Sequence, residues 1–262
     1  MNRIERRFRD LRKHDKKAFI VFITAGYPNL AVTEKLILEF TRIGVDIIEL
    51  GVPFTDPLAD GAVIQEASGQ ALKNKVHLVD ILRLVKRSRR FSDTPICLMT
   101  YYNPVFCFGE ARFAREAKKS GVDGVIIPDL PPEEARTLVK YANKAKLDVI
   151  CFISPTSTRE RIKSIVKAAR GFIYYVSLTG VTGARKNLPP DLAANLKKIK
   201  RYTSKPVCVG FGVSGPFQVK QIQKFADGVI VGSAIVKKIK ENKGRPDLIK
   251  RVSSFVKSLM KV

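Results

Sequence analysis

Short apolar runs alternate with amphipathic stretches along the whole chain. The apolar runs are rich in Val and Ile and end in turn residues, which is typical of strands buried on both faces of a parallel sheet. We predict strands at 19–24, 46–52, 95–100, 124–129, 148–154, 172–177, 206–212 and 228–233. The stretches between them repeat apolar residues with a helical period. These predict helices at 31–43, 61–74, 77–90, 108–120, 132–145, 158–169, 190–203, 215–225 and 234–260.

Eight strands that each precede a helix make the count of a closed (β/α)8 TIM barrel. Residues 1–262 fit a single domain of this kind, and no linker or shift in composition indicates a second one. The segment 1–17 lies outside the repeat, and its Ile4, Phe8 and Leu11 have the spacing of an amphipathic helix. We therefore predict an α/β protein, a single TIM barrel with an extra N-terminal helix. Its active site is expected where the strands end and the following loops begin.

The chain is strongly basic, with 48 Lys and Arg against 24 Asp and Glu and a formal net charge of +24. Such a balance can indicate binding to nucleic acid or to an anionic membrane. The basic residues, however, are spread over every helical segment, without a basic tail or an aromatic RNA-binding strand. We therefore predict solvated outer helix faces, with no nucleic acid and no membrane as partner.

Cysteine usage and the N-terminus bear on the compartment. Cys97, Cys107, Cys151 and Cys208 lack metal-binding spacing, and all but Cys107 lie in apolar runs, which indicates buried thiols in a reducing compartment. No apolar stretch approaches the about 18 residues of a membrane span. Residues 1–19 also lack the apolar core of a signal peptide. We predict a cytoplasmic protein, or one in the equivalent soluble compartment of an organelle.

The residue types at the predicted strand ends limit the chemistry. Carboxylates, tyrosines, glycines and hydroxyl side chains occur there without Lys or His, since His14 and His77 lie elsewhere. A Schiff-base aldolase needs a lysine inside the barrel, and a metal-dependent enzyme needs clustered His and carboxylates. Both classes are therefore disfavoured, and carboxylates and tyrosines remain as the acid–base groups.

Glycine-rich loops follow three neighbouring predicted strands. They are 180–185 after the sixth strand, 210–214 after the seventh and 232–234 after the eighth. In barrels the last two of these loops often bind a phosphate, because glycine lets backbone N–H groups approach and a helix N-terminus favours an anion. Any one pair of glycines could simply make a turn. The three loops together predict a phosphate site, with the long loop 180–185 as its lid.

Glu49 interrupts the apolar run 47–50 near the end of the second predicted strand. Burying an unpaired carboxylate costs several kcal/mol, so such a residue is seldom structural. Desolvation would raise its pKa and suit it to proton transfer near neutral pH. The alternative is a glutamate that faces outward at the strand edge.

The segment 48–61, IELGVPFTDPLADG, resembles the signature of the tryptophan synthase α chain family. The resemblance extends along the whole chain. It includes FITAGYP at the first strand, TYYNPVF after the third, PDLPPEE after the fourth, YYVSLTGVTGAR at the sixth, VGFGVS at the seventh and VGSAIVK at the eighth. A long signature with ordered further motifs is more specific than any single glycine pattern.

The resemblance implies a retro-aldol cleavage of indole-3-glycerol phosphate to indole and glyceraldehyde 3-phosphate. Glu49 matches the residue that protonates C3 of the indole and takes the hydroxyl proton, Asp60 the carboxylate that binds the indole N–H, and Tyr174 an orienting tyrosine near Glu49. The substrate-binding matches are Phe22, Ile64, Met99, Ile126 and Phe211 around the indole, Gly183, Gly212, Gly232 and Ser233 at the phosphate, and Thr182 in the closing loop.

The chemistry makes independent sense of these residue types. Breaking the carbon–carbon bond needs a proton at C3, a base for the hydroxyl and a counter-charge for the positive indole ring. Two carboxyl groups in different environments can divide this work, one protonated and one ionised. The resemblance implies no cofactor in this chain.

The resemblance also implies a partner, a β chain that uses pyridoxal phosphate, receives indole through a tunnel and condenses it with L-serine. An α2β2 heterotetramer is expected. The docking surface matches 53–60, 101–108 and 129–134, with Pro53, Asp56, Pro57, Asn103, Phe106, Asp129 and Pro131 as interface residues. One departure is Tyr27, which stands where an acidic residue is more usual.

Three alternatives remain open at this point. One is a lyase with the same chemistry that acts without a β chain. A second is a barrel without catalysis that only activates a partner, which the presence of Glu49 and Asp60 disfavours. A third is another sugar-phosphate barrel, such as a histidine-pathway isomerase, which would need acids where Thr24 and Ser154 stand.

Overall fold

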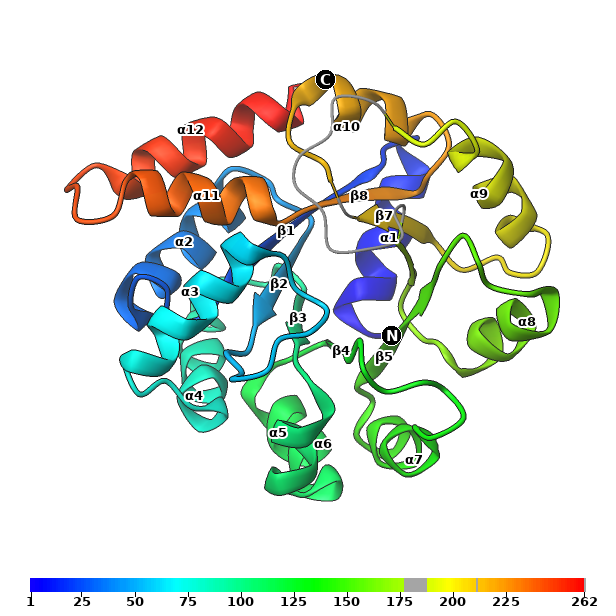
Figure 1. The fold of residues 1–262 in the computed structure, drawn as a ribbon, viewed down its shortest axis with the longest axis horizontal. Coiled ribbons are helices and arrows are strands. Elements are labelled where there is room, and N and C mark those ends of the chain that lie inside the picture. Colours follow the sequence, from blue (N-terminus) through cyan, green and yellow to red (C-terminus); the bar gives the residue numbers. More distant parts are fainter. Residues whose placement is uncertain (177–187, 211, 262) are drawn as a thin grey trace.

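Eight parallel strands close into a barrel in the order β1 to β8, and helices surround it (Figure 1). The computed structural model describes residues 1–176, 188–210 and 212–261. The strands are β1 (Ala18–Thr24), β2 (Ile47–Gly51), β3 (Ile96–Met99), β4 (Gly124–Ile126), β5 (Asp148–Ile153), β6 (Ile173–Val176), β7 (Val207–Gly210) and β8 (Gly228–Val231). The predicted TIM barrel is therefore confirmed.

The helices follow the predicted order with two differences. They are α1 (Arg3–Lys13), α2 (Leu30–Arg42), α3 (Ala62–Lys73), α4 (Leu78–Ser88), α5 (Tyr102–Phe108), α6 (Glu110–Ser120), α7 (Arg136–Ala145), α8 (Arg159–Ala168), α9 (Leu192–Lys200), α10 (Pro216–Gln223), α11 (Ser233–Glu241) and α12 (Leu248–Met260). Helix α5 replaces an expected loop. The helix expected at 234–260 is two, because Gly244 adopts a φ of 80° and Pro246 follows it. Within the described ranges, no helix is long and apolar enough to cross a membrane.

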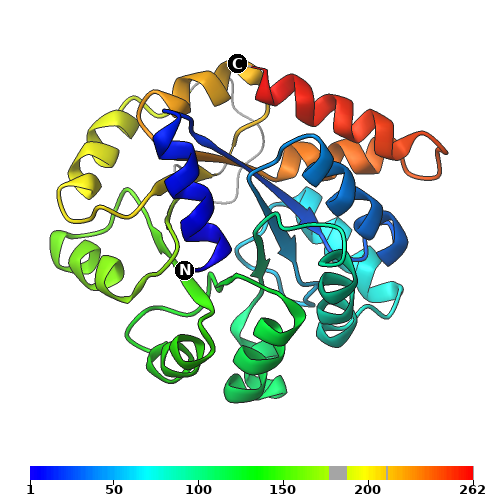
Figure 2. The ribbon, with the colours of Figure 1, turned by 180° about the vertical axis from the view of Figure 1, so that it is seen from behind.

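Helix α1 lies across the barrel end where the strands begin (Figure 2). Its Ile4, Phe8 and Leu11 are buried and join one cluster with inward side chains such as Ile20 of β1 and Phe172 just before β6. The predicted amphipathic N-terminal helix is therefore confirmed, and it closes the bottom of the barrel with apolar side chains.

Aspartates at this same end fix the starts of the strands. The carboxylate of Asp46 accepts the N–H of Phe19 at 2.6 Å, and that of Asp123 accepts the N–H of Ile96 at 3.0 Å. Asp227 repeats the arrangement with the N–H of Val207 at 2.9 Å. Each carboxylate thus links neighbouring strands. The acids at the N-terminal end of the barrel are structural, which leaves the other end for chemistry.

Candidate active site

Glu49 lies near the C-terminal end of β2, inside the barrel. In register it stands beside Phe22 of β1 and Cys97 of β3, and its side chain is fully buried. Alternation along the strand places Ile47 and Gly51 on the same inner side. The alternative of an outward-facing Glu49 at the strand edge is therefore excluded.

The surroundings of Glu49 are apolar. Neither carboxylate oxygen has a hydrogen-bond partner in the part of the chain that the structure describes. Burial alone raises the pKa of Glu49 from its ordinary 4.5 to about 8, because the charged form loses its hydration without compensation. Glu49 is therefore mainly a neutral acid at pH 7 and can donate a proton.

Asp60 ends the loop that connects β2 to α3 and is 9% exposed. Its carboxylate accepts the hydroxyl hydrogen of Tyr101 at 3.1 Å. Burial raises the pKa of Asp60 to about 6, while the hydrogen bond from Tyr101 lowers it. The carboxyl groups of Glu49 and Asp60 thus occupy different environments, and near pH 7 one is protonated and the other ionised.

Tyr174 of β6 points into the barrel beside both carboxyl groups. Its ring centroid is 4.7 Å from that of Phe152 and 6.5 Å from that of Phe172. Burial, followed by the charges of Glu49 and Asp60, raises the pKa of the Tyr174 phenol. The structure therefore brings the three predicted catalytic residues together.

Glycines on neighbouring strands make room for the aromatic rings of this site. A Cβ on Gly210 would lie 2.6 Å from Cε1 of Tyr174, and one on Gly51 would lie 2.5 Å from Cζ of Phe22. A Cβ on Gly232 would also approach Phe22, at 3.3 Å from its Cβ. Any larger residue at Gly51 or Gly210 would displace these rings.

Three further predicted contacts of the indole lie on β3, β4 and α3. Met99 and Ile126 end β3 and β4 and pack against the inner cluster that contains Tyr174. Ile64 lies in the first turn of α3 and packs against the core between barrel and helices. Phe211 lies outside the described residues.

Two helices, α10 and α11, begin at the predicted phosphate end, and the N-terminus of α11 has no side-chain cap from the residues that the structure describes. Helix α11 begins at Ser233 directly after β8, with Gly232 at its N-cap position. At α10, by contrast, Oε1 of Gln218 already accepts the N–H groups of Ser214 at 2.8 Å and Gly215 at 3.2 Å. An anion is therefore better placed at α11 than at α10.

The remaining phosphate-loop residues differ in what the structure describes. Gly212 adopts a φ of 76° and its carbonyl oxygen accepts a hydrogen bond from Gln218 at 3.3 Å. Thr182 and Gly183, predicted for the lid and the phosphate, lie outside the described residues.

A family model described as tryptophan synthase alpha chain matches residues 8–261. The chain belongs to the tryptophan synthase α chain family. The α chain of Caldanaerobacter subterraneus is 47% identical over 262 residues, covering all of both chains. That of Geobacter sulfurreducens is 48% identical over 99% of this chain and 98% of its own. The family predicted from the segment 48–61 is confirmed.

Solved structures agree with this assignment. The tryptophan synthase α chain of Legionella pneumophila superimposes with a TM-score of 0.91 at 37% identity, over 99% of this chain and 96% of that one. A chain from a structure of the tryptophan synthase α2β2 complex of Pyrococcus furiosus gives 0.87 at 41% identity, over 94% and 98%. The fold of this α chain is therefore that of its family.

The predicted docking segments of this α chain follow the neighbouring strands β2, β3 and β4 at the catalytic end of the barrel. Asp56, Asn103, Phe106 and Asp129 are exposed, and Pro57 and Pro131 are half-buried. Pro53 is buried, so it does not belong to the exposed surface of this face. Two large apolar side chains stand out on this face, because Leu58 is 85% and Phe106 63% exposed.

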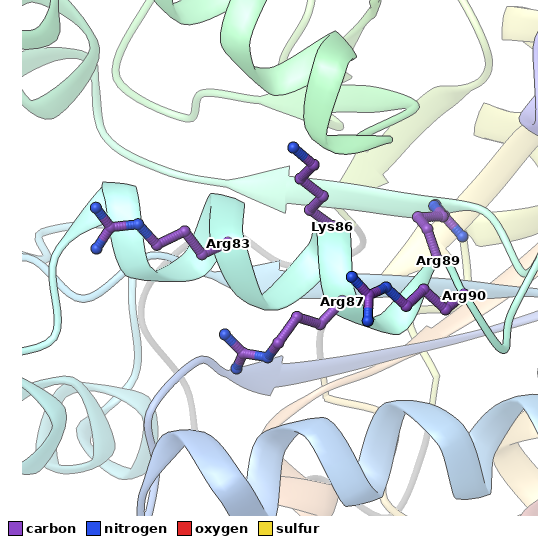
Figure 3. Close-up of a pocket in the computed structure, with 5 residues that line it drawn as sticks. All are labelled: Arg83, Lys86, Arg87, Arg89 and Arg90. Carbon is purple, nitrogen blue, oxygen red and sulfur yellow. The ribbon is translucent and has the colours of Figure 1, made fainter.

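A surface hollow on the outer side of α4 differs from the active site in its lining, which is entirely basic (Figure 3). It is lined by Arg83, Lys86, Arg87, Arg89 and Arg90. Three of these guanidinium groups form ion pairs: Arg83 with Asp80, Arg87 with Glu34 and Arg89 with Asp123. Because α4 ends here near the N-terminal ends of β3 and β4, the hollow lies at the barrel end opposite Glu49. Its lining side chains are all Lys or Arg, so it offers no carboxylate or tyrosine for acid–base chemistry.

Two residues of the site were not singled out by their types alone. Tyr101, at the end of the third predicted strand and the start of a predicted docking segment, contacts Asp60. Thr24 ends β1 in register with Gly51, and its buried hydroxyl has no hydrogen-bond partner within the described ranges. The available signal was position, since each follows or ends a strand at the catalytic end. Tyr27, the departure from the family pattern, is buried in the loop after β1.

Proposed function

We propose that this chain cleaves indole-3-glycerol phosphate to indole and glyceraldehyde 3-phosphate, with Glu49 transferring the protons and Asp60 supplying the counter-charge. The supporting observation is the fully buried Glu49, which has no hydrogen-bond partner in the described part of the chain and shares the barrel mouth with the hydrogen-bonded Asp60. Membership of the tryptophan synthase α chain family supports the same reaction.

The protons balance over one cycle with these two groups. Neutral Glu49 donates its proton to C3 of the indole, and ionised Asp60 accepts the ring N–H and stabilises its positive charge. Glu49, now ionised, takes the proton of the substrate hydroxyl as the bond between C3 and the glycerol carbon breaks. This restores neutral Glu49 and releases the aldehyde. Tyr174 packs beside Glu49 and orients it.

The substrate phosphate binds at the start of α11, through Gly232 and Ser233, with Gly212 opposite. The N-terminus of α11 supports this placement, because no side chain among the described residues caps it. Thr182 and Gly183 complete the site by their match to the family. The indole packs on Phe22, Ile64, Met99, Ile126 and Phe211. Binding energy from the phosphate positions the distant bond for cleavage, and the reaction uses no cofactor in this chain.

The two carboxyl groups predict a bell-shaped pH dependence of kcat/KM. Below a pH of about 6, Asp60 takes up a proton and loses its counter-charge. Above a pH of about 8, free Glu49 loses the proton that C3 requires. We therefore expect a maximum between these two values in a profile of indole release. A profile that rises steadily through pH 9 would exclude neutral Glu49 as the proton donor.

The partner of this chain is a tryptophan synthase β chain in an α2β2 assembly in the cytoplasm. The exposed apolar side chains at the mouth support a partner, and the Pyrococcus furiosus complex is a precedent. We expect Phe106→Asp to raise the Kd for a β chain about tenfold or more, measured by calorimetry. Phe91→Asp is the matched control, because Phe91 is 73% exposed after α4 at the other end of the barrel. Equal affinities of both variants for the β chain would show that Phe106 does not belong to the interface.

A further inference from the structure

We propose that Tyr101 is a positioning residue that holds the carboxylate of Asp60 in the orientation the cleavage needs. The inference rests on the proposed role of Asp60. Tyr101 follows β3 directly and is 5% exposed, so its hydroxyl lies inside the site.

The Tyr101 hydroxyl has two partners, and together they fix its direction. It accepts the backbone N–H of Ala59 at 2.9 Å and donates to Oδ2 of Asp60 at 3.1 Å. A phenol has a single proton to donate. Since the N–H of Ala59 occupies the acceptor side, the proton of Tyr101 is directed at Asp60. The hydroxyl thus binds both the backbone of Ala59 and the side chain of Asp60.

The ring that carries this hydroxyl is held in place. It stacks on Phe54, with centroids 5.1 Å apart and planes inclined by 27°. The backbone N–H and carbonyl of Phe54 are both bonded to Oγ of Ser68 on α3, at 2.9 and 3.1 Å. Helix α3 also contacts Asp60 directly, because Nε2 of Gln65 donates to its carbonyl oxygen at 2.9 Å. The backbone of Asp60 is therefore held by α3 and its carboxylate by Tyr101.

This arrangement leaves one oxygen of Asp60 for the substrate. Tyr101 occupies Oδ2, whereas Oδ1 accepts no hydrogen bond from the described residues. The other titratable groups nearby are Tyr174, which senses both Glu49 and Asp60, and Asp129, which acts on Tyr101. Burial and then the charge of Asp60 raise the pKa of the Tyr101 phenol, so it stays a donor over the working pH range. Oδ1 is thus the oxygen that accepts the indole N–H.

Removal of the Tyr101 hydroxyl tests this assignment. For Tyr101→Phe we expect kcat/KM for indole release to fall about ten- to thirtyfold, mostly in kcat, since the charge on the indole develops in the transition state. The acidic limb of the pH profile should move to higher pH, because the hydrogen bond that lowers the pKa of Asp60 is lost. Tyr202→Phe is the matched control, a tyrosine at the end of α9 away from the site, and should leave rate and profile unchanged.

A double-mutant cycle separates positioning of Asp60 from a general structural role. In the Asp60→Asn background, Tyr101→Phe should cost less than about threefold, because its effect passes through the carboxylate that is already gone. An equal loss in both backgrounds, or an unmoved acidic limb in folded Tyr101→Phe, would overturn the proposal. If Asp60→Asn itself retained wild-type activity, the proposed role of Asp60 would fail instead, so the two failures are distinguishable.

Discussion

Glu49→Gln is expected to reduce indole release by about 10³-fold, because the amide can neither give a proton to C3 nor take one from the hydroxyl. The side chain keeps its shape, and no hydrogen bond within the described ranges is lost, since neither oxygen of Glu49 has a partner there. The measurement is kcat/KM for indole release with the purified chain. Glu66→Gln, an exposed change of the same kind on α3, should retain wild-type activity.

The same substitution should also stabilise the fold near neutral pH. The pKa of Glu49 is about 8 in the folded chain and near its ordinary value of 4.5 when unfolded. Ionisation of Glu49 therefore favours the unfolded chain and lowers the free energy of unfolding. This destabilisation is absent below pH 4.5, grows as pH rises and reaches its full size above pH 8. Gln removes this penalty, and we expect the free energy of unfolding to rise by up to roughly 3 kcal/mol at pH 7. Denaturant unfolding of wild type and Glu49→Gln at pH 4 and pH 7 measures this difference. If the variant were inactive but as stable as the wild type at both pH values, Glu49 would not be a buried neutral acid.

Asp60→Asn is expected to lower kcat/KM about 10²- to 10³-fold by removing the negative charge that the positive indole ring needs. The oxygen of Asn can still accept the hydrogen bond of Tyr101, so the loop from Pro53 to Asp60 should keep its structure. The acidic limb near pH 6 should disappear from the residual activity, because that limb belongs to Asp60.

Asp80→Asn is the control for this second prediction. Asp80 lies in the first turn of α4, where it pairs with Arg83 and accepts the backbone N–H of His77. A surface ion pair of this kind contributes little, and the side-chain oxygen of Asn can still accept the N–H of His77. We expect wild-type activity and an unchanged pH profile. Persistence of the acidic limb in Asp60→Asn would assign it to another group.

Much of the fold could be predicted, because the strands and helices of the barrel follow from the periodic pattern of apolar residues. Continuous apolar runs predicted all eight strands, and the spacing of Ile4, Phe8 and Leu11 predicted α1. The break in the last helix was missed, although Gly244 and Pro246 lie there, because both flanks keep a helical period. Helix α5 was missed because its segment is short and contains Pro104, which is tolerated in a first turn.

The site could be predicted where the role of a residue depends on the end of the strand at which it lies. Asp46 precedes β2 and Glu49 lies within it, yet Asp46 binds the N–H of Phe19 and an arginine, whereas Glu49 has no hydrogen-bond partner within the described ranges. The hydrogen bond of Tyr101 and the capping of α10 by Gln218 could not be predicted. Both depend on how loops distant in sequence pack together, and neither has a periodic signal.

The central claim is tested most directly by indole release from indole-3-glycerol phosphate, measured with the purified chain alone and after addition of a tryptophan synthase β chain. We predict slow release by the chain alone and faster release with the β chain, and almost none from Glu49→Gln in either condition. Release without any response to the β chain would leave a lyase that acts alone. No indole under either condition would contradict the assignment of this site.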